Sequence, residues 1–91
     1  MDQIFEALAD GTRRKIIELL SERAMTAGEI AAVFSMTKPS ISHHLKKLTQ
    51  AGLIVPQKKG RYIIYRQEQE AFRRVMAWLY QAAGNVWIKV E

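Results

Sequence analysis

Apolar positions follow a helical spacing over the first half of the chain. Residues 2–9 carry apolar side chains along one helix face, and Asp10-Gly11 then breaks the pattern. A second helix is expected to begin at Thr12, as its N-cap, and to end near Arg23. The chain therefore opens with two short amphipathic helices.

Two capping patterns predict the next helices. Thr26 and Glu29 match a capping box, in which the hydroxyl and the carboxylate each bind a free backbone N–H group at the helix start. Thr37 is a second expected N-cap, and Pro39 is tolerated in the first turn because its missing N–H would have no partner there. The sequence thus predicts a short helix after Thr26 and a longer helix over residues 38–51.

The helix over residues 38–51 is expected to have two sharply different sides. At about 100° per residue, Ile41, Leu45 and Leu48 fall within one narrow apolar stripe. The opposite face is polar, basic and free of carboxylates. Its members are Ser40, Ser42, His43, Lys46 and Lys47.

A hairpin follows this helix. Residues 53–57 and 62–66 are rich in β-branched and aromatic side chains, which favours two strands. The segment 58–61, Lys-Lys-Gly-Arg, is the expected turn, and Pro56 confines the first strand to an edge. We therefore expect a two-stranded wing over residues 53–66 with a basic tip.

The last expected helix, residues 68–83, has two neighbouring apolar stripes and an expected Glu70–Arg74 pair. A helix with so wide an apolar surface must be covered on two sides, and a chain this short has little left to cover the second. A second copy of the chain is the natural cover, with residues 2–9 supplying the other dimer element. The expected interface comprises Ile4, Phe5, Leu8, Ala71, Val75, Trp78, Leu79 and Ala82.

The length of 91 residues corresponds to a single domain, residues 1–91. The chain has no cysteine, which excludes disulfides and thiolate metal sites and makes oligomerisation the remaining support for a small core. No apolar run approaches the roughly 18 to 20 residues that cross a bilayer, and no signal peptide opens the chain. We expect no membrane insertion and a cytoplasmic location.

The positive charge is concentrated in one segment. Residues 38–66 contain seven lysines and arginines and no acidic residue, whereas residues 1–37 contain six acids and four bases. Such segregation is typical of a surface that faces polyphosphate, although a solvated basic face is the plain alternative.

The order of elements is α-α-α-α-β-β-α, a mainly α fold with a two-stranded β-hairpin wing, which is the order of a winged helix-turn-helix. Residues 38–51 would enter the major groove of double-stranded DNA as the recognition helix, and the wing would contact phosphates or the minor groove. The expected DNA-binding residues are Thr37, Lys38, Ser40, Ser42, His43, Lys46, Lys47, Lys58, Lys59 and Arg61.

Several segments resemble the ArsR/SmtB-type bacterial repressors. DGTRRKI from Asp10, TAGEIA from Thr26 and KPSISHHLKKL from Lys38 match the family's helix motifs, and GRYIIY from Gly60 matches its wing. The resemblance implies a homodimer that represses by binding an inverted-repeat operator and is released by metal or another signal. It also implies a nucleoid-associated protein of the bacterial cytoplasm.

The chain departs from the family's best-known metal sites. The segment 29–33 has no thiol, and residues 67–91 contain neither His nor Asp. We therefore expect no metal and no cofactor. The sequence is more similar to the small autorepressor members that lack a metal site, the sporulation-delaying operon repressors among them, and an unidentified protein or small molecule is the effector that this resemblance allows.

Two other classes of function compete with this interpretation. An enzyme is not expected, because no nucleophile pairs with a His, no glycine-rich phosphate loop occurs and no paired carboxylates suggest a site. A winged-helix protein–protein adaptor is the alternative, but its recognition helix should carry carboxylates or exposed apolar residues.

Some side chains admit more than one role. His43 is favoured as a DNA contact over a solvated residue, whereas His44 lies beside the apolar stripe and is favoured for packing or capping. The basic run of Arg13, Arg14 and Lys15 at a helix start suggests either a phosphate contact or an ion pair with Asp10.

Overall fold

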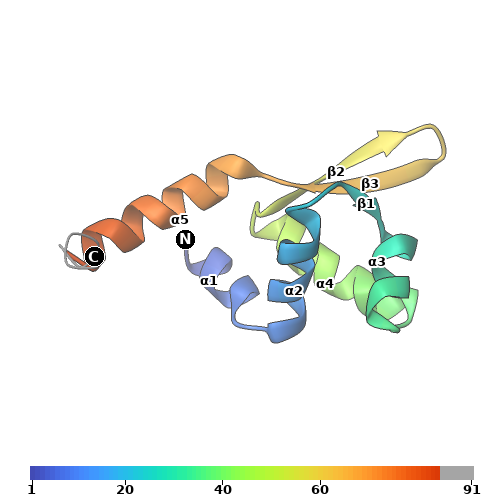
Figure 1. Cartoon of the computed structure of the whole chain (residues 1–91), viewed down its shortest axis with the longest axis horizontal. Coiled ribbons are helices and arrows are strands. Elements are labelled where there is room, and N and C mark those ends of the chain that lie inside the picture. Colours follow the sequence, from blue (N-terminus) through green and yellow to red (C-terminus); the bar gives the residue numbers. More distant parts are fainter. Residues whose placement is uncertain (85–91) are drawn as a thin grey trace.

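The computed structural model describes residues 1–84. Helices α1 to α4 lie together on one side of a small sheet, the hairpin projects at one end of the molecule, and α5 extends from the other end (Figure 1). The elements are α1 (Asp2–Leu8), α2 (Gly11–Leu20), β1 (Met25–Thr26), α3 (Ala27–Phe34), α4 (Lys38–Gln50), β2 (Ile54–Lys59), β3 (Tyr62–Gln67) and α5 (Gln69–Ala82). The expected winged helix-turn-helix order is confirmed.

The sheet has three strands rather than the two that the sequence predicted. The order is β1-β3-β2, and β1 pairs antiparallel with β3 through Met25 opposite Tyr65 and Thr26 opposite Ile64. Two residues are too few to show the alternation of apolar and polar positions that predicts a strand, so β1 is recognisable only by its pairing with β3. β2 lies at an edge, as Pro56 required.

The hairpin turn is tighter than expected. Lys58 and Lys59 belong to β2, and Lys59 pairs with Tyr62, so that the loop consists of Gly60 and Arg61. Gly60 has a φ of 60°, a left-handed conformation that glycine adopts without steric cost. The basic residues therefore lie along the end of the wing as well as at its tip.

The apolar stripe of α4 lies in the centre of the core. Ile41, Leu45 and Leu48 are buried, as predicted. Burying each such side chain stabilises the fold by about 1.5 to 3 kcal/mol. The other fully buried side chains are Ile16, Ile30, Leu53 and Ile54. Because the stripe faces inward, the polar side of α4 faces solvent.

The start of α2 differs from the prediction. Its N-cap is Asp10, whose Oδ2 accepts a hydrogen bond from the Arg13 backbone N–H at 3.0 Å, and Thr12 lies inside the helix. That hydrogen bond, followed by the Arg13 guanidinium charge, lowers the pKa of Asp10. The helix ends at Leu20, before the expected Arg23. Asp is at least as good an N-cap as Thr, and Asp10 begins the helix two residues earlier than Thr12 would.

The helix-turn-helix has the predicted caps. Thr26 Oγ1 accepts from the Glu29 backbone N–H at 3.1 Å, and Glu29 Oε1 accepts from the Thr26 N–H at 2.8 Å, which completes the capping box of α3. The backbone hydrogen bond from Thr26 lowers the pKa of Glu29. Thr37 caps α4 by accepting from the Ser40 N–H. Both helices of the motif therefore begin where the sequence placed them.

Replacing Thr26 with Ala removes the cap of α3, and we expect it to lower the free energy of unfolding by about 1 kcal/mol, within a range of roughly 0.5 to 2. Urea denaturation followed by circular dichroism measures this loss. Thr26→Ser is the matched control, since it keeps the hydroxyl. Equal losses in the two variants would contradict a capping role.

Candidate nucleic-acid interface

The polar face of α4 is exposed along its length. All of its predicted DNA-binding residues, and the N-cap residue before it, are exposed to solvent; they are Thr37, Lys38, Ser40, Ser42, His43, Lys46 and Lys47. None of these side chains is an acid. The helix therefore presents one continuous basic and hydrogen-bonding surface.

A shallow hollow lies along this face and adds a residue that sequence reasoning missed. His43, Lys46, Lys47 and Gln50 line it together. Gln50 lies seven positions after His43, which is two helical turns and hence the same side of the helix. Its carboxamide both donates and accepts, as required to pair with an adenine edge. The spacing from His43 could have revealed it.

A groove joins the wing to the starts of α3 and α4. Lys38 from α4 and Arg61 from the wing lie in the same groove, although they are far apart in the sequence. The Arg61 guanidinium carbon lies 5.8 Å from the centre of the Tyr62 ring. The other lining residues are Thr26, Ala27, Gly28, Ile63 and Tyr65, so the groove contains two cations and no carboxylate. Its chemistry suits a phosphate backbone.

Lys58 and Lys59 are exposed on β2, beside this groove's strand β3. Lys58 lies opposite Ile63 and Lys59 opposite Tyr62 in the antiparallel register. Successive residues of a strand point to opposite faces of the sheet, so the two ammonium groups serve the two sides of the wing.

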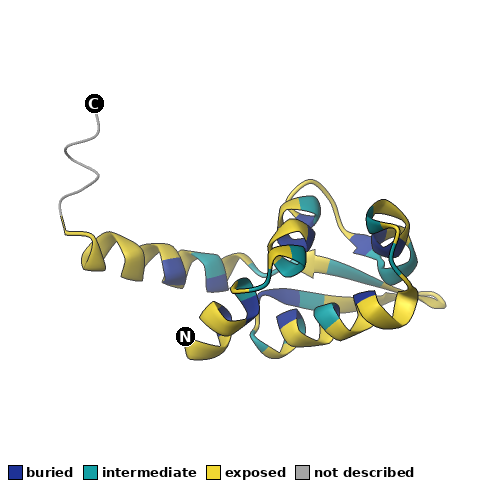
Figure 2. Ribbon diagram, turned by 90° about the horizontal axis from the view of Figure 1, so that it is seen from below, coloured by how far each residue is buried: buried dark blue, intermediate teal, exposed yellow. Residues whose placement is uncertain are grey.

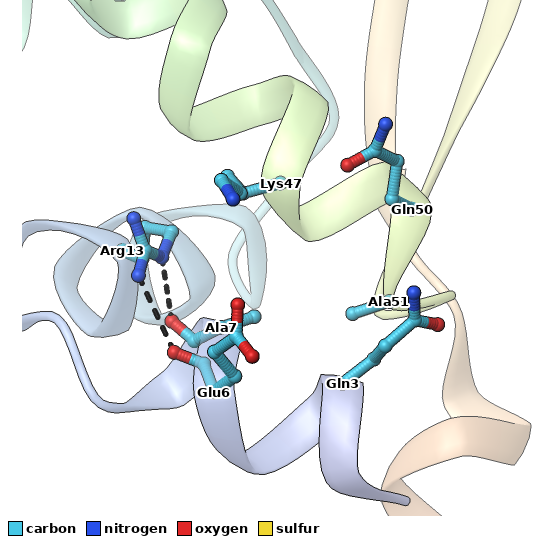
Figure 3. A pocket seen from close by; sticks show the side chains of 7 residues that line it. All are labelled: Gln3, Glu6, Ala7, Arg13, Lys47, Gln50 and Ala51. Atoms are coloured by element: carbon cyan, nitrogen blue, oxygen red, sulfur yellow. Dashed lines mark hydrogen bonds between the residues drawn. The ribbon is translucent and has the colours of Figure 1, made fainter.

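Lys47 lies in a different environment from Lys46. It lines a small pocket between α4 and α1, together with Gln50 and with Gln3 and Glu6 of α1 (Figure 3). Glu6 and Arg13 add one charge of each sign to this pocket. Lys47 therefore borders both this pocket and the hollow that it shares with Lys46.

Two arginines of the basic run at the start of α2 contact the end of α1, a role that the sequence did not suggest. Arg13 Nε donates to the Ala7 carbonyl at 2.7 Å and its Nη2 donates to the Glu6 carbonyl at 3.3 Å (Figure 3). Arg14 Nη1 donates to the Leu8 carbonyl at 2.8 Å. The two guanidinium groups thus bind carbonyl oxygens in the last turn of α1, a favourable place for cations. Lys15 is exposed.

The two adjacent histidines face different ways. His43 is exposed, whereas the side chain of His44 is only 16% exposed. His44 Nδ1 lies 3.4 Å from Arg13 Nη1 and 3.8 Å from Asp10 Oδ2. His44 thus packs against the junction of α1 and α2, and His43 is available to a ligand.

Three of the eight residues of the expected dimer surface lie in the chain's own core. Ile4, Ala71 and Val75 are buried within the chain itself, because α1 and the start of α5 pack on the core. Leu8 is half-buried and Ala82 is exposed. The expected pair of Glu70 with Arg74 is also wrong, since Glu70 pairs with Arg73 at 3.4 Å.

The projecting part of α5 is mostly exposed (Figure 2), and several of its apolar side chains are among the exposed ones. Phe5 of α1 and Trp78 of α5 meet edge to face with ring centres 5.4 Å apart, yet they remain 38% and 44% exposed. Leu79 is 44% exposed and Met76 is 68% exposed. We call this surface, formed by Phe5, Met76, Trp78 and Leu79, the α1–α5 apolar surface.

Residues 1–84 contain neither a cluster of metal ligands nor a helix that could span a membrane. No group of three or more His, Asp or Glu side chains lies close enough to hold a metal ion in that part of the chain. No helix there is long and apolar enough to cross a membrane.

Comparison with known proteins identifies relatives of the whole described fold. Residues 10–55, half of the chain, match the family model described as bacterial regulatory protein, arsR family. The transcriptional repressor SdpR of Bacillus subtilis (strain 168) is 44% identical over 79 residues, which is 87% of this chain and 88% of that protein.

Solved structures are similar over most of the chain as well. A crystal structure of an ArsR family transcriptional regulator has a TM-score of 0.83 and 38% identity, and the match covers 97% of this chain and 96% of that one. A solution structure from Mycobacterium bovis, of a homodimeric winged helix-turn-helix DNA-binding domain, has a TM-score of 0.75 and 25% identity, with 99% of this chain and 81% of that chain covered.

Removing two wing lysines together, Lys58→Ala with Lys59→Ala, should weaken the salt dependence of DNA binding. If two subunits neutralise on the order of six to ten phosphates, log K falls with log salt at a slope of about −5 to −9, and the double variant should reduce that slope by about 2 to 4. Fluorescence anisotropy of a labelled duplex at several salt concentrations measures it.

The control for this experiment is Lys15→Ala with Arg23→Ala, which removes two exposed charges from α2 and the loop after it. The control should keep the slope of the unmodified protein. A slope that does not change in the wing variant would show that the wing does not touch the DNA backbone.

Proposed function

Because the chain belongs to the ArsR family of bacterial regulatory proteins and is a DNA-binding transcriptional repressor, not an enzyme, we propose that it binds an inverted-repeat operator as a homodimer. The observation that carries this proposal is the carboxylate-free polar face of α4, which lies beside a basic wing groove. Control of its own gene, in the bacterial cytoplasm and at the nucleoid, is part of the same proposal.

In this proposal α4 lies in the major groove and reads base edges. Ser42 and His43 lie in its N-terminal half, the part that a helix-turn-helix inserts most deeply. Their hydroxyl and imidazole groups can donate or accept, whereas lysines mainly add attraction to phosphates. Gln50 extends the reading surface by two turns from His43, on the same hollow. Ser40, close to the Thr37 cap, joins the same set.

The wing and the start of α4 hold the DNA backbone. Lys38 and Arg61 line one groove with Tyr62, and Lys58 and Lys59 flank it on β2. Contacts of this kind set the position of the protein on the duplex and carry no base information themselves. Lys46 and Lys47 lie on the exposed face of α4 and add further attraction to the DNA backbone.

In this proposal, the second copy of the chain packs against the α1–α5 apolar surface. Exposed aromatic and aliphatic side chains clustered on one projecting helix are unfavourable in water and are typical of an interface. The similar domain from Mycobacterium bovis is homodimeric. Two α4 helices related by a two-fold axis require half-sites about one helical turn, or roughly 10 to 11 base pairs, apart.

The proposal assigns no metal ligand and no cofactor to this chain. The proposal includes an effector, which is either a protein or a small molecule. The alternative function is a winged-helix adaptor for another protein, which would use the same fold without specific DNA binding; the exposed face of α4 lacks the apolar residues that such a contact favours.

Trp78→Glu should shift the protein toward monomer and weaken DNA binding, because it places a charge in the centre of the α1–α5 apolar surface. Sedimentation equilibrium at micromolar concentration gives the mass. Gln81→Glu is the matched control, since it adds the same charge to the same helix away from the apolar arc. An unmodified protein that is a stable monomer would contradict the dimer.

His43→Ala should weaken binding to a duplex selected from random DNA by about 1 to 3 kcal/mol, and binding to a scrambled duplex of the same composition much less. Both affinities are measured at one stated salt concentration. Equal losses on the two duplexes would move base reading to Lys38 and Lys46. Failure of the unmodified protein to bind any duplex at low salt would instead favour the adaptor.

A further inference from the structure

His44 is a polar residue of the recognition helix that no DNA contact uses. It faces the junction of α1 and α2, where Arg13 Nη1 lies 3.4 Å and Asp10 Oδ2 lies 3.8 Å from its Nδ1. The ring lies edge to face with His43, at 5.8 Å between centres. A residue in direct contact with a proposed base-reading side chain is thus bound on its other side to the helix pair α1–α2.

The geometry of this cluster allows one hydrogen bond between Arg13 and His44. A guanidinium group only donates hydrogen bonds, so Arg13 Nη1 donates to Nδ1 of His44 in the tautomer whose proton lies on Nε2. Asp10 Oδ2 already accepts from the Arg13 backbone N–H at 3.0 Å, which holds the carboxylate beside the same arginine.

Arg13 links two helices through one rigid group. Its Nε and Nη2 donate to the carbonyl oxygens of Ala7 and Glu6 in the last turn of α1, as Figure 3 shows, and its Nη1 faces His44 of α4. Because the guanidinium group is planar and rigid, the directions of these three N–H groups are fixed relative to one another. The position of His44 on α4 is therefore tied to the end of α1.

The contact between Arg13 and His44 matters because the packing of the core only weakly opposes a small rotation of α4 about its own axis. The buried stripe of Ile41, Leu45 and Leu48 is narrow, and apolar contacts have no directional preference. With side chains about 5 to 6 Å from the axis, a roll of α4 by about 10° moves their tips by about 1 Å. Base reading tolerates about half of that. A directional bond at the flank of the stripe opposes such a roll.

We propose that the hydrogen bond between Arg13 and His44, supported by Asp10, sets the rotation of α4 about its own axis relative to α1. Arg13 and His44 are then positioning residues for operator discrimination, although neither contacts DNA. This inference rests on the proposed function of α4 as the base-reading helix. A purely packing role for His44 would need only its volume, whereas this role needs an acceptor at the place of Nδ1.

Two substitutions of His44 separate these roles. His44→Asn places Oδ1, an acceptor, the same number of bonds from the backbone as Nδ1, while His44→Leu fills the space without an acceptor. The measured quantity is the ratio of affinities for the selected duplex and its scrambled version at one salt concentration. We expect His44→Leu to lower this ratio on the order of tenfold, and His44→Asn to keep it within about twofold.

Arg13→Lys is the second, independent variant. Lysine keeps the positive charge beside Asp10 but is a point donor that cannot bridge the α1 carbonyls and His44 together. We expect a loss in the affinity ratio similar to that of His44→Leu. Urea denaturation and sedimentation accompany each variant, so that only folded protein of unchanged mass is compared.

Several results would overturn the proposal. An unchanged ratio in His44→Leu, or an equal loss in His44→Asn and His44→Leu, would reduce His44 to packing, as would unfolding of both His44→Leu and Arg13→Lys. These results differ from a failure of the proposed function, in which the unmodified protein itself binds the selected and scrambled duplexes equally.

Discussion

Burial of one narrow apolar stripe on α4 determines which side of that helix meets solvent. Ile41, Leu45 and Leu48 occupy the centre of the core, with neighbours from α2, α3 and the sheet. Since the stripe is continuous, every polar residue of the helix is displaced to the flanks or to the far side. The exposure of the basic face is thus a consequence of packing, and the contact of His44 with Arg13 at the flank concerns only its fine rotation.

Polar contacts at the helix ends provide hydrogen-bond partners for backbone groups that the core does not satisfy. Asp10 and the Thr26–Glu29 box satisfy N–H groups at the starts of α2 and α3, and Arg13 and Arg14 satisfy carbonyls at the end of α1. Each carboxylate involved has a lowered pKa. A group of this kind stabilises the fold above its unfolded pKa, near 3.8 for Asp10 and 4.5 for Glu29, and loses that contribution as pH falls through the lower folded value.

The sequence predicted the features that depend on neighbouring residues. Helical periods, the Thr26 and Thr37 caps and the edge position of Pro56 are local, and they determine the helices and the wing. Two errors are local, since Asp10 caps α2 in place of Thr12 and Arg73 pairs with Glu70 in place of Arg74. The other errors involve contacts between distant segments. The pairing of β1 with β3 and the burial of Ile4 and Ala71 depend on tertiary packing, which no local pattern encodes. The same holds for the interface, where Gln50 could be found from its spacing but the groove that unites Lys38 with Arg61 could not.

The short strand β1 joins the wing to the helix-turn-helix as one mechanical unit. Thr26 pairs with Ile64 of the wing and at the same time caps α3, so the sheet ends where the helix begins. Such a direct junction leaves no linker that could act as a hinge between the two contact elements. The distance from α4 to the wing is thereby nearly constant, and in the proposed complex a duplex whose grooves are spaced differently would have to bend or twist to fit. Part of the selectivity would then come from the stiffness of the DNA itself, at base pairs that the protein does not touch.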